Sequence, residues 1–202
     1  MPNHPYTAVL GFRPHTYWTS AVALAGPLDA PRVLERRRVV FAAGKERSVY
    51  HQAEADPAGG PALLAEVRAA TEANAAREIG ALVADLQRDG LRVGCAATAA
   101  ATAKLPDRLE DILRSHAMMH TAEGSFYRDV VAAACVSVGL QVERVVEREL
   151  TALVGDRLGL NPAAVEARLK AMGPALGPPW SEDYKLATLA AWLQLDDTDE
   201  DD

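Results

Sequence analysis

The sequence predicts an α/β domain in which a small antiparallel sheet is followed by alternating helices and strands. Three apolar segments separated by turn signals occupy the first 41 residues, and a long segment with helical periodicity follows them. Beyond it, short apolar segments alternate with helical ones. With 202 residues, 49% of them hydrophobic, the chain can bury a core of its own.

The first three strands are predicted to form an antiparallel meander. Pro14 favours a turn after the first strand, and Gly26 and Pro27 mark a turn after the second. The third strand carries charge on both faces, which is typical of an edge strand. The three strands are expected at Thr7–Phe12, Tyr17–Leu24 and Arg32–Phe41.

The rest of the chain is predicted to contain mostly helices. Lys45–Gly60 is interpreted as a loop because of its proline and glycines, and Gly124 is a candidate interruption of the central helix. Strands are expected at Leu91–Ala100 and Gln141–Val146, and helices at Pro61–Asp89, from Pro106 to Val138, and at Arg148–Leu158, Pro162–Met172 and Glu182–Leu195. This order is that of the RNase H-like fold. We expect a core over 1–158, a C-terminal helical extension over 159–195 that completes the domain, and a disordered acidic tail over 196–202.

Charge and composition restrict the classes of function. The net charge is −7, but six of the carboxylates lie in the last seven residues, so the body of the protein is close to neutral. This balance disfavours broad, non-specific binding of nucleic acid. The two cysteines lie in apolar surroundings, and no segment approaches the roughly 18 apolar residues of a membrane span. We therefore expect a cytoplasmic protein with free thiols and no membrane partner.

The segment Ser115–Arg128 carries the clearest signal of a site. His116, His120 and Glu123 share a helical spacing with Leu109, Leu113 and Tyr127, so they are predicted to lie on the inward face of one helix. Ionisable groups in such a position are costly unless they are paired or bind something.

The chain resembles the RuvC-like branch of the RNase H-like superfamily. Gly11-Phe-Arg-Pro-His-Thr16 is similar to the family's opening turn, Leu140-Gln-Val-Glu-Arg-Val145 to a later strand, and Asp183–Trp192 to the closing helix. The resemblance implies a site built from carboxylates that hold two Mg²⁺ or Mn²⁺ ions. Here the family's first aspartate falls on Arg13, its second acidic position falls in Ala96–Ala100, and only Asp183 matches the last one. These departures from the family pattern argue against a standard two-metal nuclease.

Three interpretations of these residues stay open. In the first, His116, His120 and Glu123 bind a divalent metal such as Zn²⁺, Mn²⁺ or Mg²⁺ and, with Asp183, form a rebuilt catalytic site. In the second, Arg13, His15, Arg128 and Lys185 form a basic pocket that binds phosphate. In the third, the histidines are ordinary core residues and Glu123 pairs with Arg128 or Lys185.

We favour a RuvC-like protein associated with nucleic acid, in which the two-metal centre has been lost or rebuilt. The alternatives are a metal-dependent nuclease or other phosphodiester hydrolase with a His/Glu site, and a non-catalytic module that binds a protein, including a second copy of this chain. All eight candidate residues are expected in one cleft, within about 15 Å of one another, a few turns of helix.

Overall fold

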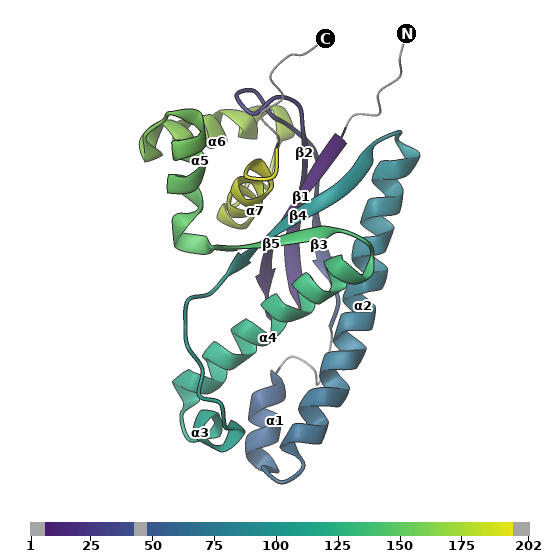
Figure 1. The fold of residues 1–202 in the computed structure, drawn as a ribbon, viewed down its shortest axis with the longest axis vertical. Helices are drawn as coiled ribbons and strands as arrows, with labels where there is room; N and C mark the ends of the chain where they lie inside the picture. The colour runs from purple at the N-terminus through teal and green to yellow at the C-terminus, as the bar shows by residue number, and fades with distance from the viewer. Residues whose placement is uncertain (1–6, 43–47, 196–202) are drawn as a thin grey trace.

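A mixed five-stranded sheet forms the centre of the molecule (Figure 1). The computed structural model describes residues 7–42 and 48–195. The strand order is β3-β2-β1-β4-β5, in which the first three strands are antiparallel and β4 and β5 run parallel to β1. The strands are β1 (Thr7–His15), β2 (Trp18–Ala25), β3 (Arg32–Val40), β4 (Arg92–Ala100) and β5 (Gln141–Val146). The predicted α/β, RNase H-like order is confirmed, and β3 is an edge strand as expected.

The first strand is longer than predicted, because Arg13–His15 continue it instead of forming a turn. The turn is confined to Thr16 and Tyr17. Pro14 is tolerated because β1 pairs with β4 only as far as Phe12, so no ladder hydrogen bond on that side needs its missing N–H. This extension brings Arg13 and His15 into the regular alternation of the strand.

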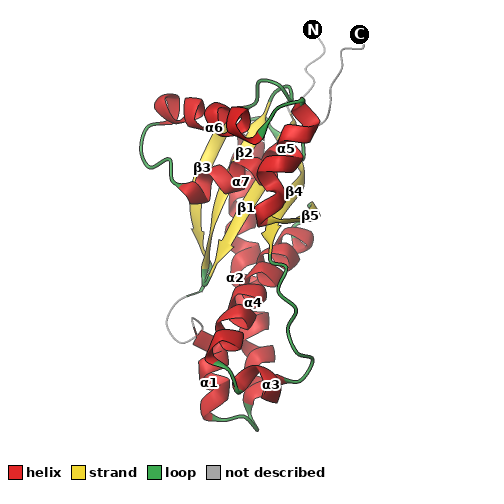
Figure 2. Ribbon diagram, turned by 90° about the vertical axis from the view of Figure 1, so that its left-hand side faces the viewer, coloured by secondary structure: helices red, strands yellow, loops and turns green. Residues whose placement is uncertain are grey.

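Helices cover both faces of the sheet (Figure 2). One face packs against α2 (Gly60–Arg88) and α4 (His116–Ser137), and the short helices α1 (Val49–Ala55) and α3 (Leu109–Leu113) contact these two beyond the end of the sheet. The other face packs against α7 (Glu182–Trp192), which is flanked by α5 (Leu150–Leu158) and α6 (Pro162–Leu176). A 3-10 turn, Glu147–Glu149, joins β5 to α5.

The alternation of β1 divides the core into two parts. Leu10 and Phe12 point to the α2/α4 side, where they join Ile79 and Tyr127. Val9 points to the α7 side and joins the cluster around Trp192. Since Arg13 and His15 follow Val9 at steps of two, they share its face and lie on the side of α7.

Several other predicted features of the helices are wrong. Part of the expected loop Lys45–Gly60 is the helix α1, which forms because Val49, Tyr50 and Ala53 are buried against neighbouring helices; residues 43–47 of that loop lie outside the described residues. The helix expected from Pro106 is divided, because Ser115 is extended and accepts a hydrogen bond from the backbone N–H of Met118 as the cap of α4. Gly124 does not interrupt α4, and α6 continues to Leu176.

Cys95 is half-buried and Cys135 is buried, and the two cysteines are not joined in a disulfide. Burial raises the pKa of the Cys135 thiol to about 12, so this thiol is protonated at neutral pH. Within residues 7–42 and 48–195, no helix has the length and apolar character needed to cross a lipid bilayer.

Candidate functional site

Charged side chains from three elements meet at the edge of the sheet where β1, β4 and β5 end. Arg13 and His15 come from β1, Glu147 follows β5 directly, and Asp183 lies in the first turn of α7. The carboxyl ends of parallel strands share one edge, and this edge is the usual place for a site in open α/β sheets.

Arg13 bridges both carboxylates of this group. Its Nη1 lies 2.6 Å from Asp183 Oδ1, and its Nε and Nη2 each lie 3.3 Å from a different oxygen of Glu147. The three side chains are between 22% and 29% exposed, so solvent screens these ion pairs only in part. One guanidinium thus neutralises much of the charge of two carboxylates.

His15 completes the group at the edge of the sheet. Its Nε2 lies 2.9 Å from Asp183 Oδ1, and its ring stacks on Trp18 with centroids 3.9 Å apart. Partial burial and the positive charge of Arg13 lower the pKa of His15, and Asp183 only partly offsets them. The imidazole is therefore neutral at pH 7.

Arg128, on α4, lines the neighbouring pocket, which has a volume of about 480 Å³. Its guanidinium fits beside Gly124, where a Cβ atom would lie only 2.9 Å from Nη1. Its buried Nε has no hydrogen-bond partner among the described residues. Burial lowers the pKa of Arg128, and the nearby negative charge of Glu147 only partly offsets this. The pocket is also lined by Ala100–Ala103, Val146, Glu147, Arg148, Thr151 and Leu186.

Lys185 belongs to a different pocket from Arg128. Its Nζ lies 3.3 Å from Glu182, and it lines a pocket together with Glu166 and Lys170. It makes no ion pair with the carboxylates that bind Arg13. Of the predicted basic set, Arg13 and His15 are in direct contact and Arg128 lies close by.

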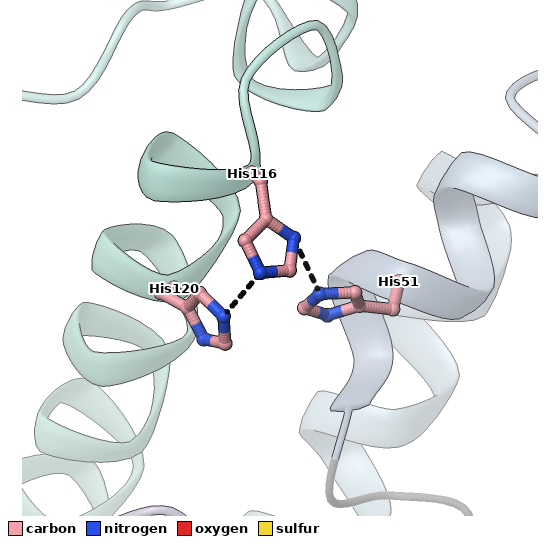
Figure 3. A group of neighbouring side chains, drawn as sticks. All are labelled: His51, His116 and His120. Atoms are coloured by element: carbon pink, nitrogen blue, oxygen red, sulfur yellow. Dashed lines mark hydrogen bonds between the residues drawn. The ribbon is translucent and has the colours of Figure 1, made fainter.

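Three histidines form a second group at the far end of α4 (Figure 3). His116 and His120 are one turn apart on α4, and His51 reaches them from α1. His120 Nε2 lies 3.0 Å from His116 Nε2, and His51 Nε2 lies 3.4 Å from His116 Nδ1. His116 and His120 are exposed and His51 is half-buried.

Glu123 lies beneath these imidazoles and is only 5% exposed. Its Oε1 lies 3.3 Å from His51 Nδ1, and its Oε2 lies 4.0 Å from His120 Nδ1. The pairing of Glu123 with Arg128 or Lys185 that one interpretation required is therefore wrong.

The expectation of one cleft is also wrong. His116 and Arg128 are twelve residues apart in the continuous helix α4, so about 18 Å separate them along its axis. The candidate residues form two groups, one at the edge of the sheet and one between α1 and α4, and Lys185 lies in a further pocket.

Sequence reasoning missed two members of these groups. Glu147 was not selected, although a carboxylate directly after a parallel strand is a recognisable signal of a sheet-edge site. His51 was not selected because it lies in the segment predicted as a loop. No local pattern in the sequence relates His51 to His116.

The fold is shared with the protein RuvC. The Thermus thermophilus RuvC structure in complex with a Holliday junction substrate superposes with a TM-score of 0.55 and 10% sequence identity, over 93% of this chain and 92% of that one. A second T. thermophilus RuvC structure gives a TM-score of 0.52 at 11% identity with the same coverage. No protein-family model and no curated protein sequence matches the chain. The RuvC-like, RNase H-like fold predicted from the sequence is thus confirmed.

Proposed function

We propose that this chain, which has the fold of RuvC, binds nucleic acid through the pocket beside Arg128 and does not cleave it with a two-metal centre. The observation that carries the proposal is the position of Arg128. Its guanidinium lines an open pocket at the carboxyl ends of the parallel strands, and its buried Nε has no hydrogen-bond partner within the described residues. A phosphate bound in the pocket would accept hydrogen bonds from the accessible part of this guanidinium.

The residues at the edge of the sheet do not fit a pair of divalent cations. Such ions require several oxygen ligands, commonly shared carboxylates. Here Glu147 and Asp183 already accept hydrogen bonds from Arg13, and the end of β4 leads into Ala100–Ala103, which offer no carboxylate. A cation brought next to the Arg13 guanidinium would also be repelled by it.

Two further features support binding of a phosphate backbone. Arg148 lines the same pocket as Arg128, so two guanidiniums face one opening. The pocket volume of about 480 Å³ is large enough to admit a nucleotide-sized group. Because the first of the RuvC structures is a complex with a Holliday junction, a four-way DNA junction is the first ligand to test.

The test is a fluorescence-anisotropy titration of four-way, duplex and single-stranded DNA and RNA at several salt concentrations. We expect the Kd to rise with salt. Arg128→Gln should weaken binding about 10- to 100-fold, since a hydrogen bond to a charged group contributes about 1.5–3 kcal/mol. It should also reduce the slope of log K against log salt by about one.

The matched control is Arg92→Gln. Arg92 is the first residue of β4, at the opposite end of this strand from the Arg128 pocket, and is exposed. The Arg92→Gln variant loses the same charge as Arg128→Gln. Its Kd should stay within about twofold of the wild-type value, because an exposed charge remote from the ligand is largely screened. Equal losses of affinity in the two variants would mean that Arg128→Gln acts only through the net charge of the protein. No binding at low salt would overturn the proposal in favour of a protein-interaction module.

A cleavage assay with Mg²⁺, Mn²⁺ or Zn²⁺ tests the second half of the proposal. We expect intact DNA and RNA in every lane. Cleavage that is lost in Glu147→Gln and Asp183→Asn would contradict our view of the sheet edge. Cleavage that is lost instead in His116→Ala and His120→Ala would establish the rebuilt hydrolase.

A further inference from the structure

We propose that His51, His116 and His120 form a transition-metal site, which binds Zn²⁺ through three imidazole nitrogens and leaves a fourth position open to water. The site is independent of nucleic-acid binding at Arg128. It differs from the metal set predicted from the sequence, because His51 supplies the third ligand and Glu123 acts behind the ligands.

The spacing of the three imidazoles agrees with a tetrahedral metal. Nitrogens bound to Zn²⁺ at about 2.0–2.1 Å lie about 3.3–3.4 Å apart. One ring nitrogen from each histidine lies within 4.8 Å of the other two. His116 approaches His120 through its Nε2, at 3.0 Å, and His51 through its Nδ1, at 3.4 Å. Figure 3 shows the His116 ring standing between the other two rings. Small rotations of the side chains would therefore bring three nitrogens onto one ion.

In His51 and in His120, one ring nitrogen faces His116 and the other faces a carboxylate. His51 and His120 both turn Nε2 towards His116, and both turn Nδ1 towards Glu123. A carboxylate that accepts a hydrogen bond from Nδ1–H fixes the tautomer in which Nε2 is free to bind metal. Glu123 thus orients His51 directly, and its other oxygen lies 4.0 Å from His120 Nδ1.

The charge of Glu123 also calls for a cation. Its side chain is 6% exposed, and its hydrogen-bond and ion-pair partners within the described residues are two histidines. A buried carboxylate is costly unless a positive charge compensates it. A divalent ion held by the same imidazoles would provide the missing positive charge.

The donor set selects the class of metal. Imidazole nitrogens suit Zn²⁺, Cu²⁺ and Ni²⁺, whereas Mg²⁺ and Ca²⁺ require oxygen ligands. Since His116 and His120 are exposed, an ion at this site would face solvent at its fourth position. Because His51 lies on α1 and the other two on α4, the ion would also link these helices.

The experiment is a Zn²⁺ titration of the full chain, without an affinity tag, in competition with a chromophoric chelator. We expect one ion per chain and visible absorption bands of four-coordinate geometry when Co²⁺ replaces Zn²⁺. His51→Ala and His116→Ala should each abolish competition with the chelator. Glu123→Gln should weaken binding about 10- to 100-fold, as loss of a partner behind a metal ligand does.

The matched control is His15→Gln, which removes a histidine that belongs to the edge of the sheet. Binding should be unchanged in this variant. Circular dichroism spectra and the Tm in the presence of a chelator establish that each variant is folded. Added Zn²⁺ should raise the Tm of the wild type but not the Tm of the variants that lack one of the three histidines. Failure of the wild type to bind Zn²⁺, or binding that survives His51→Ala, would overturn the proposal. Neither result would bear on DNA binding at Arg128.

Discussion

Arg13 determines the electrostatics of the sheet edge at the scale of single residues. Its guanidinium occupies the space between Glu147 and Asp183, and it does so because strand alternation puts it on the side of α7. An arginine forms planar, paired hydrogen bonds that carboxylates accept well. The two acidic residues are thus bound within the protein.

Loss of Arg13 should destabilise the fold. Arg13→Gln leaves two half-buried carboxylates without their cation, and we expect the free energy of unfolding to fall by about 1–3 kcal/mol, between the values for exposed and buried pairs. Urea denaturation measures this. The double variant Arg13→Gln/Asp183→Asn should recover part of the loss, since it also removes one uncompensated charge. Purely additive losses would argue against a bridging role for Arg13.

His15 should make stability depend on pH on the acid side. Its pKa is lowered in the folded protein by burial and Arg13, although Asp183 and Glu147 oppose this. The unfolded chain therefore binds a proton at His15 as the pH falls below about 6.5, before the folded protein does. This contribution to stability is complete above about pH 6.5 and is lost on acidification.

The measurement is the free energy of unfolding of the wild type and of His15→Gln between about pH 7.5 and 5, a range that spans the usual histidine pKa. The wild type should lose stability with falling pH more steeply than His15→Gln. The comparison cancels the titration of the other histidines. Parallel curves would show that His15 titrates alike in both states.

At the scale of helices and strands, the packing of α7 on β1 holds the sheet-edge site together. Gly11 lies under this helix, and a Cβ atom built on it would come 1.9 Å from the backbone oxygen of Ala187 and 2.5 Å from the nitrogen of Ala191. The absence of a side chain at Gly11 permits this approach. Asp183, in the first turn of the same helix, can then reach Arg13.

Gly11→Ala should therefore displace α7. We expect the free energy of unfolding to fall by about 3 kcal/mol or more, at the upper end for overpacked cores, because backbone atoms cannot move aside as a side chain can. Gly94→Ala in β4 is the matched control, since nothing lies within 4 Å of its Cβ position, and it should change stability by less than about 1 kcal/mol. Chemical denaturation of both variants compares them. A similar loss in both would mean that the effect belongs to glycine in strands generally.

Elements differed in how well the sequence predicted them. The apolar runs of β1, β2 and β4 and the helical spacing of the apolar residues in α2 are local signals, and the sequence predicted these elements. The helix α1 was missed, because its seven residues are too few to be stable alone and depend on packing against α2 and α4. With α1, the residue His51 was missed as well.

At the scale of the whole molecule, the two groups of functional residues lie in different parts of the fold. The sheet edge contains Arg13 and Arg128, whereas the histidines lie where α1 meets α4 beyond the sheet (Figures 2 and 3). Variants in one group should therefore leave the ligand of the other unaffected, since effects of distant sites are usually additive. Zn²⁺ affinity measured with and without a four-way junction tests this independence.

The sequence by itself determined the order of elements, the antiparallel arrangement of the first three strands, and the presence of a cation, Arg13, at the end of the first strand. These depend on periodicity and on residue type, which are local properties of the chain. Only the tertiary structure decided that Arg13 is paired with Glu147 and Asp183, that the buried Nε of Arg128 has no hydrogen-bond partner in the described part of the chain, and that His51 joins His116 and His120. Contacts between residues 65 to 170 positions apart depend on how helices pack on the sheet, which no local pattern encodes.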